Sequence, residues 1–133
     1  MKKIALFAFL LFFCVKLMSQ EKLKRWVYKE IDTTRLFMEA LYPKESSEKK
    51  LPAIIFFFGG GWKGGSIDQF RPQAKYFASR GIIAVLVDYR VASRHNSTPF
   101  DAVRDAKSAI KFLRFNAKDL GIHPDKIIAA GGS

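Results

Sequence analysis

Hydrophobic residues along the chain fall into short runs that predict five β-strands. Residues 26–30 and 36–42 are rich in aromatic and branched side chains, which are typical of strands. Residues 53–58 and 82–87 are continuous apolar runs, as expected for strands that are buried on both faces. A shorter run at 127–130 predicts a fifth strand that leads directly into Gly131-Gly132-Ser133.

Two segments between the later strands predict helices. In the first, apolar residues recur at helical spacing over residues 70–78, and Gly81 supplies a stop. The second begins at Thr98, which can cap a helix that has Pro99 at its first position, and it ends at Gly121. Its apolar stripe is predicted to consist of Ala102, Val103, Ala106, Ile110, Leu113 and Ala117. Its other side carries Arg104, Lys107, Lys111, Arg114 and Lys118.

The order of these elements predicts the fold class. Strands that alternate with helices form an α/β fold whose central strands are parallel, and right-handed crossovers place the helices against the sheet. The chain has 133 residues, which is enough for one domain at most. Its 49% hydrophobic and 26% charged residues are those of an ordinary globular protein and exclude a disordered or low-complexity chain.

The first twenty residues predict a secretory signal peptide. Lys2 and Lys3 precede an apolar run at residues 4–15, and small or polar residues follow it. The run is shorter than the roughly 20 residues that a helix needs to cross a bilayer, and an uncleaved N-terminal anchor is the alternative. The single cysteine, Cys14, lies in this leader, which excludes a disulfide framework. We therefore expect a domain of residues 21–133 in a secreted or periplasmic protein, with no stable membrane span after cleavage.

The chain is strongly basic. Lys and Arg number 23 against 12 Asp and Glu, which gives a net charge of +11, or +8 without residues 1–20. The cations are spread out, with no block of five like charges and no interleaved aromatic residues of the kind that bind nucleic acid. A solvated basic surface is the simplest interpretation. A non-catalytic protein that binds polyanions or an anionic envelope is the alternative.

Two segments carry the candidate chemistry. The loop Phe58-Gly59-Gly60-Gly61-Trp62 directly follows a buried strand. Glycines there let the backbone approach a ligand and leave N–H groups free to point at an anion. The second segment is Gly131-Gly132-Ser133, where small residues permit a sharp turn that raises the serine hydroxyl above the sheet.

The glycine loop also fits a dinucleotide-binding pattern. Gly59, Gly61 and Gly64 satisfy G-x-G-x-x-G, and Asp88 ends the next strand, where a ribose-binding acid would lie. Against this interpretation, residues 62–69 have no helical stripe, two further strands precede the motif, and the leader directs the protein away from the nicotinamide pool. The Gly-Lys-Ser/Thr of a phosphate-binding P-loop does not follow at the required spacing. A purely structural glycine turn stays open as an alternative.

Five motifs in a fixed order carry a family resemblance. They are Phe58-Gly-Gly-Gly-Trp62, Asp88-Tyr89-Arg90, the helix with Asp105 and Ala109, the turn at 121–127, and Gly131-Gly132-Ser133. Over roughly residues 33–133 the chain resembles the N-terminal half of an α/β-hydrolase esterase of the hormone-sensitive-lipase and acetyl-esterase type. Those enzymes carry H-G-G-G-[FW] as the oxyanion loop and G-x-S-x-G as the nucleophile elbow.

The resemblance implies a serine carboxylic-ester hydrolase. The leader implies that it is secreted, and export suggests that it acts on acetyl groups of polysaccharides or on other small acyl esters. Ser133 would be the nucleophile, the backbone amides of Gly60 and Gly61 would form the oxyanion hole, and Trp62 would contact the substrate. The resemblance implies no cofactor and no metal. The expected partner is an ester substrate, and nucleic acid is not expected. A serine peptidase of the prolyl-oligopeptidase type on the same fold is the alternative enzyme.

The sequence departs from the family pattern at two places. Phe58 stands where the family usually has histidine, although the oxyanion donors are backbone amides. The family's catalytic acid and histidine follow the serine in the order Ser, Asp/Glu, His, so we expect neither of them within residues 1–133. His95 and His123 are expected to be surface residues, the latter at the sheet end opposite the active site. We therefore expect a chain truncated at the elbow, without the C-terminal half of the hydrolase domain, and inactive by itself.

Overall fold

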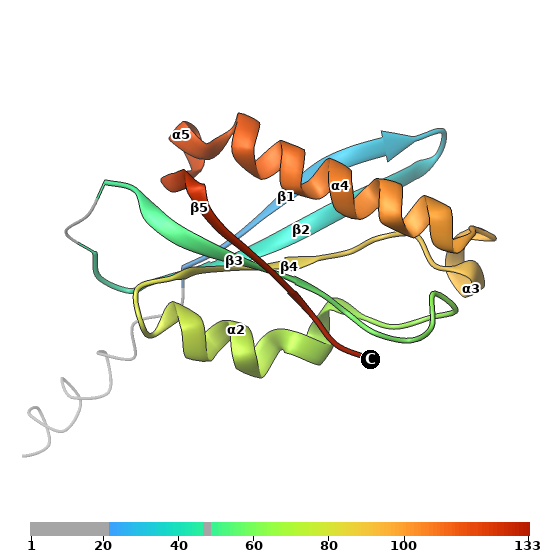
Figure 1. The fold of residues 1–133 in the computed structure, drawn as a ribbon, viewed down its shortest axis with the longest axis horizontal. Coiled ribbons are helices and arrows are strands. Elements are labelled where there is room, and N and C mark those ends of the chain that lie inside the picture. The colour runs from blue at the N-terminus through green and yellow to red at the C-terminus, as the bar shows by residue number, and fades with distance from the viewer. Residues whose placement is uncertain (1–21, 47–48) are drawn as a thin grey trace, which may run out of the picture.

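Five strands form one sheet that has helices on both faces (Figure 1). The computed structural model describes residues 22–46 and 49–133, so the leader expected at residues 1–20 lies outside it. The strands are β1 (Lys22–Ile31), β2 (Thr34–Tyr42), β3 (Leu51–Phe57), β4 (Ile83–Val87) and β5 (Ile122–Gly131). The helical elements are η2 (Ile67–Phe70), α2 (Arg71–Ala78), α3 (Ala92–His95), α4 (Pro99–Phe115) and α5 (Ala117–Leu120). No helix within the described residues is both long enough and apolar enough to cross a bilayer.

The sheet is mixed, with the strand order β1-β2-β4-β3-β5. The central strands β4, β3 and β5 are parallel, as the alternation of strands and helices predicts. β1 and β2 are antiparallel because a two-residue turn at Asp32 and Thr33 joins them, and β2 is antiparallel to β4. The α/β class and the parallel central strands are therefore confirmed, and the N-terminal hairpin of β1 and β2 makes the sheet as a whole mixed.

Two apolar layers pack against the sheet. One lies between the sheet and α4, where Leu36, Met38, Ile55, Val85 and Leu113 are fully buried. The other lies beneath α2, where Ala74 and Ala78 face the opposite side of β3 and β4. These two layers explain why β3 and β4 are apolar at successive positions: side chains on both faces of each strand are covered.

The buried face of α4 differs from the predicted apolar stripe. Val103 was predicted to face the core, but its side chain is 48% exposed. Asp105 and Ala109 are fully buried instead. A pattern of apolar residues could not place Asp105 in the core, because Asp105 is a charged residue whose burial depends on cations from other elements. The N-terminus of the helix agrees with prediction, since Thr98 and Asp101 form a capping box.

Candidate active site

The carboxyl ends of the three parallel strands lie at the same level. Phe57 of β3 is paired with Val87 of β4 on one side and with Gly131 of β5 on the other. The segments that follow these strands therefore meet, and they enclose a pocket of about 250 Å³. Its lining residues are Phe58, Gly59, Gly60, Gly61, Trp62, Tyr89, Gly132 and Ser133. Every residue that the sequence analysis singled out for the site thus borders one pocket.

The glycine loop presents two adjacent backbone N–H groups that have no acceptor among the described residues. They belong to Gly60 and Gly61, whereas the N–H of Gly59 donates to Oε1 of Gln69 at 2.6 Å. The carbonyl oxygen of Gly60 accepts from the N–H of Lys63 at 3.0 Å, which closes a tight turn. Successive free N–H groups in such a turn form a concavity that binds an anion.

The backbone of this loop requires glycine for two different reasons. Gly60 has φ +135°, and a Cβ there would collide with the carbonyl oxygen of Gly64. Gly61 has φ +58°, but a Cβ there would meet nothing within 4 Å. The constraint at Gly60 is therefore both steric and conformational, and the constraint at Gly61 is conformational alone.

The loop is also in contact with the end of β5. A Cβ on Gly59 would collide with the carbonyl oxygen of Gly132 and would lie 2.7 Å from Cα of Ser133. A Cβ on Gly132 would lie 3.0 Å from the ring of Phe70 in η2. These close approaches bring the free amides of the loop and Ser133 into the same small space.

Trp62 follows the glycines in a left-handed conformation, with φ +60°. For a residue with a side chain this conformation costs about 1–2 kcal/mol. Two hydrogen bonds from α3 hold the segment: Ala92 N–H donates to the Trp62 carbonyl, and Ser93 N–H donates to the Lys63 carbonyl, each at 2.9 Å. The side chain of Trp62 is 50% exposed at the rim of the pocket. No sequence pattern predicted α3, which is only four residues long.

Phe58, in the position of the family's usual histidine, is buried against Tyr89. The two rings are stacked, with centroids 4.2 Å apart and an interplanar angle of 15°. The Tyr89 hydroxyl donates a hydrogen bond to the carbonyl oxygen of Phe58. Burial raises the pKa of Tyr89 above its ordinary value, so this hydroxyl stays protonated as a donor. Gly65 makes room for the ring, because a Cβ there would collide with Phe58.

A buried ion cluster supports the strand end that carries Tyr89. Asp105 of α4 is fully buried and accepts hydrogen bonds from Lys29 Nζ at 2.6 Å and from Arg90 Nε at 2.8 Å. Burial alone would raise the pKa of Asp105, but the hydrogen bonds from Arg90 and Lys29 outweigh it and hold the pKa below its ordinary value. The cluster ties β1, α4 and the end of β4 together next to the pocket.

Asp88 is not available for a ribose. Its side chain is 6% exposed, and its two oxygens accept from Arg94 at 2.8 and 3.2 Å. The acid that the dinucleotide interpretation requires is thus engaged by an arginine from α3. This pairing argues against that interpretation.

Neither histidine lines the pocket. His95 is the last residue of α3, and its Nδ1 accepts from the N–H of Val91 at 3.2 Å. His123 lies near the start of β5, at the opposite end of the sheet, where its Nδ1 accepts from the N–H of Asp125 at 3.3 Å. Both are partly exposed. Among the described residues, no group of three His, Cys, Asp or Glu side chains could hold a metal ion.

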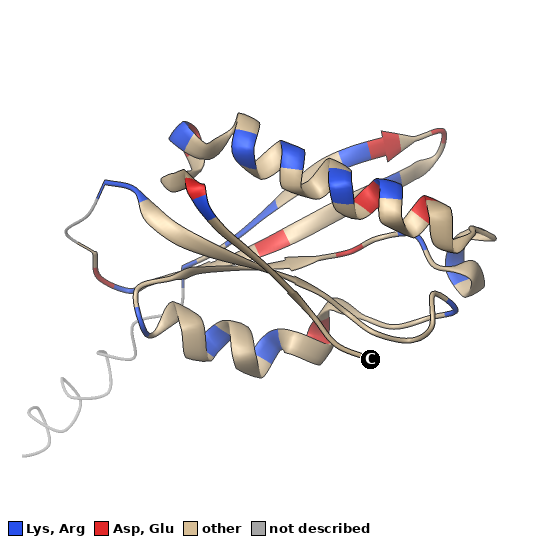
Figure 2. Ribbon diagram, in the orientation of Figure 1, with Lys and Arg blue, Asp and Glu red and all other residues tan. Residues whose placement is uncertain are grey.

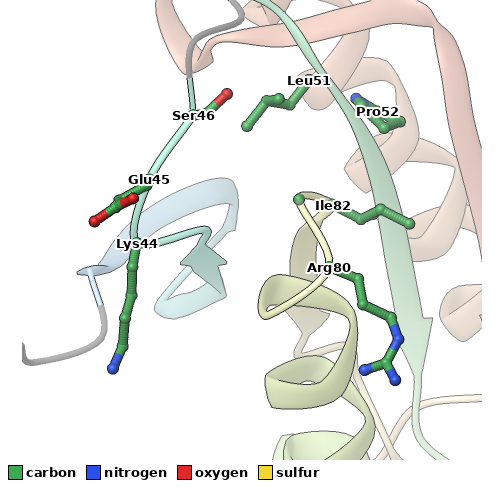
Figure 3. A pocket seen from close by; sticks show the side chains of 8 residues that line it. Lys44, Glu45, Ser46, Leu51, Pro52, Arg80 and Ile82 are labelled. Carbon is green, nitrogen blue, oxygen red and sulfur yellow. The ribbon is translucent and has the colours of Figure 1, made fainter.

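A larger hollow of about 870 Å³ lies at the amino ends of the parallel strands (Figure 3). Lys44 and Arg80 lie on opposite sides of it, and Leu51, Pro52 and Ile82 form part of its wall. In an open parallel sheet, ligands bind at the carboxyl ends of the strands. We therefore assign the candidate site to the smaller pocket beside Ser133.

Comparison with known proteins places this geometry in a family. The profile of the BD-FAE family matches residues 38–133. The carboxylesterase NlhH of Mycobacterium tuberculosis is 38% identical over 85 residues, which cover 62% of this chain and 26% of that protein. An AB hydrolase superfamily protein of Schizosaccharomyces pombe is 36% identical over 84 residues, which cover 62% of this chain and 24% of that protein.

Solved structures of an esterase have a fold similar to that of this chain. A thermophilic esterase of Thermogutta terrifontis, Est2, is 48% identical with a TM-score of 0.79, over 88% of this chain and 41% of that one. The same esterase phosphorylated by paraoxon matches with a TM-score of 0.80 and 49% identity, over 83% of this chain and 43% of that one. The chain thus spans about a quarter of the length of these curated relatives and less than half of this esterase.

Proposed function

Because the chain belongs to the BD-FAE family and has an α/β-hydrolase esterase fold, we propose that it contributes the nucleophile and the oxyanion hole of a serine carboxylic-ester hydrolase. The observation that carries the proposal is the pair of unpartnered N–H groups at Gly60 and Gly61, which share a pocket with Ser133. Two adjacent donors beside a hydroxyl suit a reaction in which a carbonyl oxygen becomes negatively charged.

In the proposed reaction, Oγ of Ser133 attacks the ester carbonyl carbon and forms a C–O bond while its proton passes to a base. The carbonyl oxygen becomes an oxyanion that accepts hydrogen bonds from the amides of Gly60 and Gly61, each worth about 10²–10³ in rate. Collapse breaks the bond to the alcohol, which leaves with a proton, and an acyl-enzyme remains. Water then attacks the acyl-enzyme and releases the carboxylic acid.

The base is not among the residues that line the pocket. The family pattern expects a histidine and its acid after the serine. We therefore propose that a polypeptide of residues 1–133 hydrolyses esters no faster than its Ser133→Ala variant. Its activity would require the later part of a hydrolase domain.

Two features of the chain support a particular class of ester substrate. The resemblance to acetyl esterases supports a short acyl group such as acetyl, and Trp62 borders the pocket that would receive it. The leader pattern at residues 1–20 supports export, so we propose that the enzyme acts on acetylated polysaccharides or other small acyl esters outside the cytoplasm.

A chimera tests the proposal directly. Residues 22–133 would be joined to the part of the Thermogutta esterase that follows its matched region, which supplies a C-terminal half from a protein 48% identical. We expect the chimera to hydrolyse p-nitrophenyl acetate and its Ser133→Ala variant to lose about 10⁴-fold or more in kcat. The control is Ser108→Ala, at an exposed helical serine that bonds only to the Arg104 carbonyl. A chimera that folds and in which Ser133→Ala keeps the activity of the parent would contradict the proposal.

A further inference from the structure

A row of cations lies on the outward side of α4, away from the proposed active site. It consists of Arg104, Lys107, Lys111 and Arg114, and we call it the α4 cationic face. Spacings of three and four residues place these side chains on one side of a helix, over a length of about 15 Å. All four residues are exposed. Figure 2 shows that basic residues recur along α4 and continue on α5, where Lys118 lies.

Little of this charge is neutralised within residues 22–46 and 49–133. Arg104 has a carboxylate oxygen of Asp101 at 3.5 Å, whereas Lys107, Lys111 and Arg114 have no ion-pair partner there. On other elements, Arg35, Arg71, Arg90 and Arg94 are each paired with an acid, whereas Arg80 lies over the ring of Tyr76 and has no acid partner among the described residues. The charges of Lys107, Lys111 and Arg114 are therefore available to an external anion.

The start of β1 extends the same basic surface. The Nζ atoms of Lys22 and Lys24 lie 6.0 and 5.0 Å from the ring centroid of Tyr42. The Tyr42 hydroxyl donates to the carbonyl oxygen of Leu120 at the end of α5, at 2.9 Å. Two further exposed cations are thus held beside α5, on the side of the sheet that α4 covers.

Exposed phenyl rings lie at both ends of the row. Phe100 is 76% exposed and Phe115 is 88% exposed, and helical spacing places both on the same side of α4 as Lys111. A soluble polyanion would be recognised by the cations alone. Rings beside cations fit an anionic bilayer surface, where the charges meet headgroups and the rings enter the boundary with the acyl chains.

We propose that the α4 cationic face, with Phe100 and Phe115, docks the protein on an anionic lipid surface. The charged heads of Lys107 and Lys111 reach the headgroups while their apolar stems stay against the helix. The docked helix lies parallel to the surface and does not enter the bilayer core. The inference is independent of the proposed esterase activity, because it uses none of the pocket residues.

Vesicle binding of the full 133-residue chain tests the charge requirement. Vesicles of 30% phosphatidylglycerol in phosphatidylcholine would be compared with pure phosphatidylcholine at 0.1 M salt. We expect Lys107→Gln with Lys111→Gln to weaken binding to the anionic vesicles about 25-fold, since each cation near such a surface contributes about fivefold. The matched control is Lys75→Gln on α2 with Arg80→Gln just after that helix. It removes the same charge from the other side of the sheet, and we expect binding to stay close to that of the parent.

A second pair of variants separates a lipid from a soluble polyanion. We expect Phe100→Gln with Phe115→Gln to weaken vesicle binding about tenfold and to leave binding to dextran sulfate unchanged. Circular dichroism would establish that each variant is folded, and every variant carries the same residues 1–21, so their contribution to binding cancels. Equal vesicle binding by the parent and the lysine variant would overturn the proposal. Vesicle binding that depends on the lysines but not on the phenylalanines would assign the face to a polyanion instead.

Discussion

Replacing Asp105 by asparagine should destabilise the fold by about 3–5 kcal/mol, which is the usual cost of breaking a buried ion pair from one side. Asp105 is fully buried, and its carboxylate accepts hydrogen bonds from Lys29 and from the side chain and the backbone N–H of Arg90. Asparagine has nearly the same shape but carries no charge, and its NH₂ group would face cationic donors. The side chains of Lys29 and Arg90 are 23% and 16% exposed, so water can only partly replace the lost carboxylate.

Urea unfolding of the chain and its variants would measure this loss. Asp119→Asn is the matched control, because Asp119 is exposed on α5, and we expect it to change the free energy of unfolding by no more than about 0.5 kcal/mol. A loss below about 1 kcal/mol for Asp105→Asn would refute the reasoning, since it would mean that the cations are not held by this carboxylate.

The same cluster predicts a pH dependence. The pKa of Asp105 is lower in the folded protein than in the unfolded chain. The stability that its carboxylate contributes is therefore complete above the ordinary aspartate pKa of about 3.9 and is lost as the pH falls through the lower folded pKa. The free energy of unfolding of the parent should therefore fall below about pH 4. The Asp105→Asn variant should show a smaller fall over the same range.

Three further predictions concern the pocket and use the kcat/KM of the chimera. Gly60→Val should lose about 10²-fold or more, and Gly61→Val less than that, because only the Cβ at residue 60 would collide with the Gly64 carbonyl; equal losses would contradict this distinction. Phe58→His should stay within about threefold of the parent, since backbone amides and not this side chain contact the oxyanion. Tyr89→Phe should lose roughly tenfold in kcat with little change in KM, because the hydroxyl that holds the Phe58 carbonyl is removed, and an unchanged kcat would show that this hydrogen bond does not position the loop.

The sequence predicted best those elements whose burial comes from apolar side chains. β3 and β4 were predicted to within two residues, because layers on both faces of the sheet require continuous apolar runs. β5 begins at Ile122 and not at residue 127, because its polar first half is paired through backbone register with Leu51, which side-chain patterns do not report. The buried position of Asp105 was also missed, since it depends on cations from β1 and from the end of β4.

The site could be predicted as motifs but not as geometry. The glycine loop and Ser133 were identified from local sequence. They come together because β3 and β5 end side by side, with Phe57 paired to Gly131. Tyr89 was quoted only as part of a motif, because its contact with Phe58 joins residues that are 31 positions apart. The hydrogen bonds from α3 to the carbonyl oxygens of Trp62 and Lys63 are made by backbone atoms, so no residue type could have indicated them.

The central claim is that Ser133 and the amides of Gly60 and Gly61 together form an acyl-transfer site. A crystal structure of the chimera after reaction with paraoxon, the reagent that phosphorylates the Thermogutta esterase, tests this most directly. We predict a phosphoryl group bonded to Oγ of Ser133, with one of its oxygens about 2.7–3.1 Å from the amide nitrogens of Gly60 and Gly61. A phosphoryl group on another residue, or one whose oxygens all point away from these two amides, would contradict the account.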